Sequence, residues 1–126
     1  MGVATKMNKW QAQYAFWSSF GIPAYEENAV PDRKDLTYPY LTYQAVGAPF
    51  DSDTFVNVSV WTRSTSLATV TEITDNILKR FENGKAEVRY NGGGFFITPE
   101  SNFAQVMGDE SDTLIKRIIL SVVIHW

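Results

Sequence analysis

Few side chains in this sequence have the types and the spacing that catalysis or metal binding requires. His125 is the only histidine and there is no cysteine, so a histidine pair, a thiolate metal site and a cysteine nucleophile are excluded. Asp51, Ser52 and Asp53 have the form of an Asp-x-Asp cation site, but two acids are too few and they lie in a predicted turn. We therefore predict that the protein needs no metal and no cofactor.

Two other polar patterns lack the structural context that their chemistry needs. Asp109, Glu110 and Asp112 form an acidic group, but it lies in a hydrophilic connection where no burial would separate the pKa values for acid and base catalysis. The glycines of residues 91–94 could cradle a phosphate only ahead of a helix, and a strand pattern follows them. Because no catalytic constellation remains, the sequence favours a structural or binding role over an enzyme.

Composition sets the general class of the protein. The chain has 126 residues, of which 44% are hydrophobic, and no linker-like segment, so we expect one domain spanning residues 1–126. The formal charge of −3 offers no basic stripe for holding nucleic acid. The longest apolar stretch, residues 118–126, is too short for a membrane helix, and the amino terminus has no apolar signal core. We therefore expect a soluble protein without a membrane partner.

The first part of the chain predicts one helix and one long loop. Met7, Trp10, Tyr14 and Trp17 recur at spacings of three and four, which predicts a helix over residues 6–20 that carries them on one face. Residues 24–39 are polar and have no period, so they predict a long loop. A loop of this length is a candidate for contact with a neighbouring chain.

The sheet and a second helix are expected in residues 40–126. Residues 40–46 and 55–63 are rich in β-branched and aromatic residues and predict a hairpin, with the valines of the second strand facing inward. Between this hairpin and the glycine turn, a helix is predicted by an apolar stripe at Val70, Ile73, Ile77 and Phe81.

The last part of the chain predicts three more strands. Residues 87–90 and 95–98 flank the glycine turn as a second hairpin. Residues 116–126 are apolar on both faces, as in a central strand, and we expect His125 at the end of that strand. This order of elements predicts an α+β fold, an antiparallel β-sheet packed with two helices.

Two segments carry apolar side chains that the predicted elements do not accommodate. Phe103, Val106 and Met107 lie in a polar connection, residues 99–112, without helix or strand period. The loop between the first two strands places an aromatic residue beside two acids, which suit the rim of an interface. Exposed apolar groups mark interaction sites. The interface candidates are therefore Phe50, Asp51, Asp53, Phe103, Val106 and Met107.

The sequence leaves two other arrangements of these residues open. Phe103 and Met107 could instead pack on their own sheet, as apolar side chains commonly do. Residues 24–39 would then be the next candidate for the contact between copies.

From residue 38 onward the chain resembles the tail terminator proteins (tail completion or minor capsid proteins) of long-tailed bacteriophages and prophages of Gram-positive bacteria. The resemblance rests on short motifs in a fixed order. They are Tyr-Pro-Tyr-Leu-Thr-Tyr at 38–43, Val-Trp at 60–61, Asn-Gly-Gly-Gly-Phe at 91–95, Phe-Ala-Gln-Val-Met at 103–107 and Ile-Lys-Arg-Ile-Ile-Leu-Ser-Val at 115–122.

The resemblance implies an α+β subunit whose copies form a ring, generally six-fold, that caps the head-proximal end of the tail tube. The implied partners are further copies of the chain, the tail tube protein and the head–tail connector protein. The implied location is the virion, after assembly in the bacterial cytoplasm. DNA would pass through the lumen without being held, which suits the acidic net charge. The family has no catalytic residues to carry over.

Two other function classes stay open. A head–tail joining (neck) protein could share this architecture and would also be an assembly subunit. A small-molecule-binding α+β domain would instead need an apolar pocket with a few converging polar groups.

Overall fold

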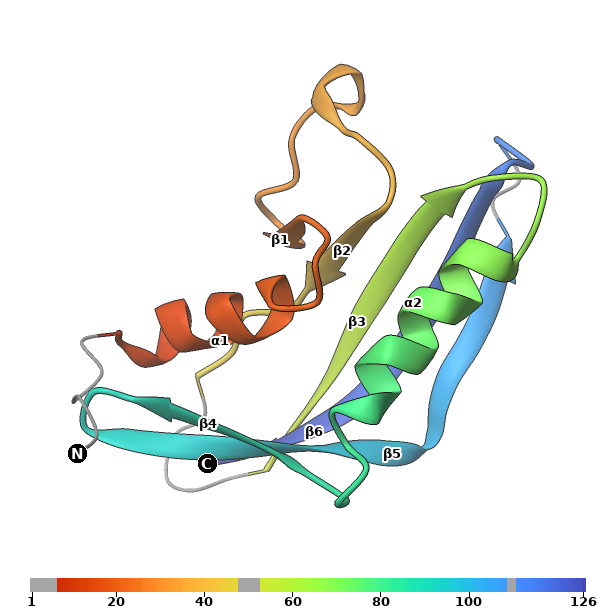
Figure 1. Cartoon of the computed structure of the whole chain (residues 1–126). Helices are drawn as coiled ribbons and strands as arrows, with labels where there is room; N and C mark the ends of the chain where they lie inside the picture. Colours follow the sequence, from red (N-terminus) through yellow and green to blue (C-terminus); the bar gives the residue numbers. More distant parts are fainter. Residues whose placement is uncertain (1–6, 48–52, 109–110) are drawn as a thin grey trace.

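The described part of the chain forms six strands in one sheet, with two α-helices against it (Figure 1). This computed structural model describes residues 7–47, 53–108 and 111–126. The elements in chain order are α1 (Lys9–Ser18), β1 (Ala24–Glu26), a 3-10 helix (Arg33–Asp35), β2 (Tyr40–Tyr43), β3 (Thr54–Arg63), α2 (Ala68–Lys79), β4 (Ala86–Tyr90), β5 (Gly93–Gly108) and β6 (Ile115–His125). The fold is therefore α+β, as the sequence predicts.

The sheet has the strand order β1-β2-β3-β6-β5-β4, so β6 lies near its centre as its two-sided apolar sequence predicts. The predicted pairing of β2 with β3 and of β4 with β5 is confirmed, and β3–β6 and β5–β6 are antiparallel as well. The prediction of a purely antiparallel sheet is wrong at one place, because β1 pairs with β2 in parallel. The sheet is therefore mixed.

Two predicted loops contain regular structure. Residues 24–39 hold β1 and the 3-10 helix, which at three residues each are too short to produce a hydrophobic period. Residues 99–112 were expected to be an irregular connection, but β5 continues through them to Gly108. From Ala104 to Gly108 this strand is exposed, so no alternation of burial marks it in the sequence.

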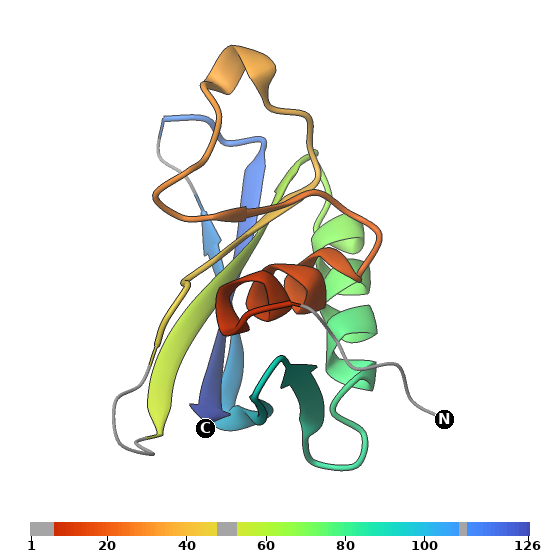
Figure 2. The same cartoon turned by 90° about the vertical axis from the view of Figure 1, so that its left-hand side faces the viewer.

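The core lies between the sheet and the two helices. The predicted inward face of β3 is confirmed, since Val56, Val58 and Val60 are buried. Val70 and Ile77 of α2 are fully buried against this side, as the apolar stripe predicts. α2 packs against β3 and β6 and lies in front of them in Figure 1, and α1 contacts β1 and β4. The side view shows α2 standing to one side of β3 and β6 (Figure 2).

The predicted helix over residues 6–20 is shorter in the structure and presents a different face. Asn8 and Gln11 form a capping box that starts α1 at Lys9, with hydrogen bonds of 2.9 and 3.0 Å between each side chain and the other residue's backbone N–H. The face turned to the core holds four residues. They are Ala12, Gln13, Phe16 and Trp17.

Of the predicted aromatic stripe on α1, only Trp17 is buried. Met7, Trp10 and Tyr14 are 37%, 47% and 52% exposed. The regular spacing of these residues therefore describes the outer side of the helix rather than its core side.

Candidate interaction surface

The distal half of β5 is an uncovered edge of the sheet. β4 pairs with β5 only over residues 93–97, whereas β6 follows the other side of β5 as far as Gly108. Within the described part of the chain, residues 98–108 therefore have no strand partner on their outer side. Figure 1 shows this half of β5 extending well beyond the end of β4. An uncovered strand edge presents free N–H and C=O groups to any strand that approaches.

The last part of this edge lacks the features that protect strand edges from pairing. Pro99, Glu100 and the register shift between Pro99 and Ala104 protect its first part. Residues 103–108, Phe-Ala-Gln-Val-Met-Gly, contain no charged residue and no proline. Val106 is 52% exposed and Met107 is 38% exposed, although both lie within the strand. Residues 103–108 therefore form an uncharged and accessible edge.

A groove runs along α2 next to this edge. Phe81 packs against Phe103 of β5 with 6.1 Å between the ring centroids. Phe81 also lines a hollow of about 370 Å³ whose wall includes Leu78, Asp75 and Glu82. Leu78 is exposed on the outside of the helix. The groove therefore combines an apolar floor with acidic margins.

The interface candidates predicted from the sequence are placed as follows. Phe50 and Asp51 lie outside the described residues. Phe103 is half-buried and packs on the core of its own chain, which is the alternative that the sequence left open. Val106 and Met107 are exposed on the β5 edge.

Asp53, the sixth candidate, contacts His125 rather than projecting freely. A carboxylate can only accept, so the Nδ1–H of His125 donates to Asp53 Oδ1 over 3.0 Å. Nε2 of the same ring lies 2.8 Å from the hydroxyl of Thr98, which donates to it when the ring is neutral. The ring stacks on Phe96 with 4.5 Å between centroids. These residues tie the start of β3 to β5 and β6.

The hydroxyl, imidazole and carboxylate of this group stand in the order of a hydrolase triad. No sequence motif indicates this group, because Thr98 and Asp53 are 27 and 72 positions from His125. The nucleophile would be a secondary hydroxyl in the middle of a strand. The hollow next to this group is lined by His125 but not by Thr98, so the hydroxyl does not face it.

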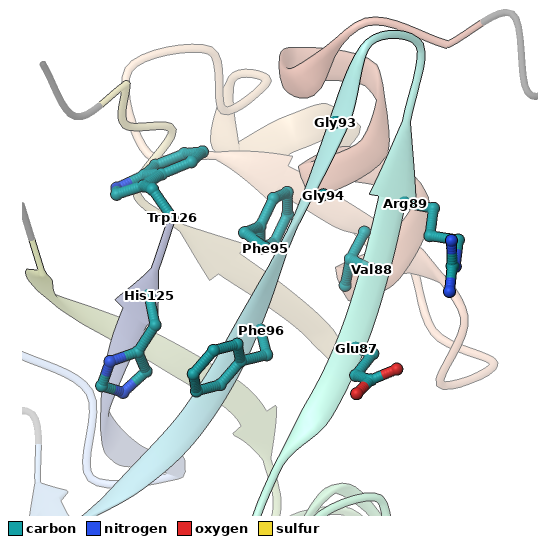
Figure 3. Close-up of a pocket in the computed structure, with 9 residues that line it drawn as sticks. All are labelled: Glu87, Val88, Arg89, Gly93, Gly94, Phe95, Phe96, His125 and Trp126. Atoms are coloured by element: carbon teal, nitrogen blue, oxygen red, sulfur yellow. The ribbon is translucent and has the colours of Figure 1, made fainter. Parts of the chain in front are cut away.

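That hollow lies at the end of the sheet, between the β4–β5 hairpin and the carboxyl terminus (Figure 3). Its volume is about 330 Å³, and its wall includes Phe96, His125, Trp126 and Arg89. Phe96 and His125 lie side by side, whereas Arg89 extends away from both rings (Figure 3). Its polar groups therefore do not converge as they would around a bound small molecule.

The face of the sheet opposite the helices carries a row of stacked side chains across four strands. Tyr40, Trp61, Arg117 and Met107 are register partners from β2 to β5. Tyr40 and Trp61 stack with their rings 12° from parallel, and Arg117 Nε donates to Ser59 Oγ over 3.0 Å. Burial lowers the pKa of Arg117 from its ordinary value. The row reaches the free edge of β5 at Met107.

The remaining acidic residues form no metal site in the part of the chain that is described. Asp112 accepts from Arg63 Nε over 3.0 Å, and residues 109–110 lie outside that part. Across residues 7–47, 53–108 and 111–126, no three His, Asp or Glu side chains cluster to hold an ion. No helix among them is long and apolar enough to cross a membrane.

Comparison with known proteins identified no relative: the sequence matches no protein-family model and no curated protein.

Proposed function

We propose that this protein is a structural assembly subunit, a tail terminator whose copies form a ring, generally six-fold, on the head-proximal end of a phage tail tube. The observation that carries the proposal is the last part of the uncovered β5 edge, residues 103–108, which is uncharged and bears exposed Val106 and Met107. A stable monomer protects such an edge with charge, proline or a covering element. An edge without this protection is expected in a subunit whose edge is covered by another copy after assembly.

The resemblance to tail terminator proteins supports the same edge of β5 as the contact between copies. One of its motifs, residues 103–107, lies on the distal half of β5, and another, residues 115–122, lies on the neighbouring β6. A ring needs a surface that repeats head to tail from copy to copy. The proposed partners are therefore other copies of the chain, the tail tube protein and the head–tail connector protein.

The test compares one lysine substitution on the edge with the same substitution elsewhere. Val106→Lys would place a charge on the edge, whereas Phe55→Lys makes the same charge change at a residue that is 70% exposed on β3. Sedimentation velocity should show rings for the parent and for Phe55→Lys, and monomers for Val106→Lys. A parent protein that stays monomeric even with purified tail tubes would contradict the proposal.

A head–tail joining protein is the alternative within the same class. The two differ in what they bind first, since a terminator caps tubes that lack heads. Adding the protein to polymerising tail tube subunits should fix tube length in the absence of heads. Binding to filled heads without any effect on tube length would favour the joining protein.

A second candidate function, hydrolysis of an activated ester, is favoured only by the Thr98–His125–Asp53 geometry. It requires His125 to remove the Thr98 proton as the hydroxyl attacks the acyl carbon, after which the bond to the ester alcohol breaks and the alcohol leaves. Water must then attack the acyl group on Thr98 and release it as the acid. We expect the protein and its His125→Ala variant to hydrolyse p-nitrophenyl acetate at the same rate. A burst that disappears in both His125→Ala and Thr98→Val would favour the hydrolase.

A further inference from the structure

α1 carries an aromatic side that its own chain covers only in part. Trp10 and Tyr14 lie on this side and are 47% and 52% exposed, with the Trp10 ring beside Gly47. Large aromatic side chains that remain exposed together on one element are typical of interaction sites. Lys9 is the only charged residue within α1, and its ammonium group lies 5.4 Å from the centroid of the Trp10 ring. The side is therefore aromatic with one positive charge.

The groove beside the β5 edge has the opposite character. Leu78 and Phe81 give it an apolar floor, and Asp75 and Glu82 place two negative charges on its wall against the single positive charge of Lys79. Its volume of about 370 Å³ is sufficient for an inserted aromatic side chain. The aromatic side of α1 and this groove are therefore complementary in both polarity and charge.

The two surfaces cannot meet within one chain. α1 lies at one side of the molecule over β4 and β1, and the distal half of β5 forms the opposite side beyond α2 (Figure 1). In a head-to-tail ring, each copy uses one surface for the copy before it and a different surface for the copy after it. Two complementary surfaces on opposite sides of one subunit meet this requirement.

We infer that α1 of one copy docks into the α2–β5 groove of the next copy, with Trp10 and Tyr14 seated on Leu78 and Phe81, and Lys9 facing Asp75 and Glu82. This inference rests on the ring proposed above and names the two surfaces that build it. The neighbouring β5 edge, at Val106, is covered by the same contact.

The decisive experiment mixes two variants that each lack one of the two surfaces. Trp10→Ser with Tyr14→Ser removes the aromatic side of α1 and leaves the groove, whereas Leu78→Lys blocks the groove and leaves α1. Each variant alone should sediment as a monomer. An equimolar mixture should form dimers and nothing larger, because only one intact groove and one intact α1 side remain to pair. Circular dichroism and thermal melting of each variant establish that both are folded.

A charge exchange tests the same contact without removing apolar side chains. Lys9→Glu should weaken ring association about tenfold, and Asp75→Lys with Glu82→Lys should do the same. Combining all three substitutions should restore association to within about threefold of the parent, since opposite charges again face each other. If the Trp10→Ser, Tyr14→Ser protein of the mixing experiment does not fold, Tyr14→Lys takes its place in that experiment.

The outcomes separate this inference from the proposed function. Rings formed normally by the α1 variants would overturn the inference and leave the ring proposal standing. Two monomeric variants whose mixture also stays monomeric would overturn it too, because the two surfaces then do not pair with each other. A parent protein that forms no ring, alone or on tail tubes, would overturn both proposals.

Discussion

The guanidinium carbon of Arg117 lies 4.4 Å from the centroid of the Trp61 ring, on the face of the sheet opposite the helices. The two residues are register partners on β6 and β3, the two central strands. Arg117 also donates to Ser59, which is buried. The contact therefore holds the two central strands together on the face that has no helix.

Replacing Arg117 by methionine should destabilise the protein while preserving its apolar packing. The variant loses the cation–π contact and leaves Ser59 without its donor, and together these changes cost about 1–3 kcal/mol. Urea unfolding should show a lower midpoint at unchanged slope. Arg89→Met, at an exposed residue of β4, is the matched control and should change the free energy of unfolding by less than about 0.5 kcal/mol. Equal midpoints for the two variants would contradict the stabilising role.

Leu120→Asp should prevent folding, because the side chain is fully buried in the central strand β6. An unpaired buried carboxylate costs several kcal/mol, against a total stability of about 5–15 kcal/mol. Gln105→Asp places the same charge on the exposed part of β5 and should leave the protein folded. The near-ultraviolet circular dichroism of both variants measures the difference. A folded Leu120→Asp protein would contradict the position of this strand.

The elements that the sequence predicts well are those with one clearly buried face. The valines of β3 and the stripe at Val70, Ile73 and Ile77 alternate with polar residues at the period of their element, because a single core covers one side of each. One face of β6 is buried at Ile118, Leu120, Val122 and Ile124, and Val123 on the opposite face is buried as well. Burial on a regular period is thus what made these elements predictable.

The elements that the sequence predicts poorly lack a face that is buried at a regular period. The distal half of β5 is exposed at Ala104, Gln105, Val106 and Met107, so its strand period leaves no trace in hydrophobicity. On α1 two of the aromatic residues, Trp10 and Tyr14, are exposed, and the sequence alone assigns them to a helix face but not to its outer side. Both surfaces depart from the usual pattern at the places where we propose contact with other copies.

Tyr43 should ionise at a higher pH than a tyrosine that is fully open to solvent. Burial raises its pKa, and the nearby charge of Glu26 and the neighbouring Tyr14 raise it further. Because the pKa is higher in the folded state, its contribution to stability is present below the unfolded pKa of about 10 and is lost as pH rises through the folded value. Ultraviolet titration should show one late tyrosinate step that is absent in Tyr43→Phe. A titration without that late step would contradict the burial of this phenol.

Removal of metal ions should leave stability unchanged. In the described residues no three acidic or histidine side chains come together, and Asp112 is engaged with Arg63. A ligand that binds only the folded state raises the melting temperature, so its removal would lower it. Melting curves with and without EDTA should coincide. A large decrease would direct attention to residues 51–53 and 109–112.

Gln13 should prove indispensable, although nothing in the sequence distinguishes it from the exposed Gln11. Its side chain is buried, and Nε2 donates to Val46 O over 2.8 Å while Oε1 accepts from Val46 N over 2.9 Å. This pair of hydrogen bonds fastens α1 to the segment that follows β2 and so sets the position of the helix.

Gln13→Glu is the sharpest substitution at this position, because it keeps the shape of the side chain and replaces its donor by a second acceptor. A carboxylate would still accept from Val46 N but would face Val46 O, so we expect a loss of about 2–4 kcal/mol at neutral pH. Gln11→Glu, at the exposed capping position, should cost less than about 1 kcal/mol. Lowering the pH should return part of the stability of Gln13→Glu only, since the protonated acid regains a donor for Val46 O. A Gln13→Glu protein as stable as Gln11→Glu would show that α1 is held in place by its apolar contacts alone.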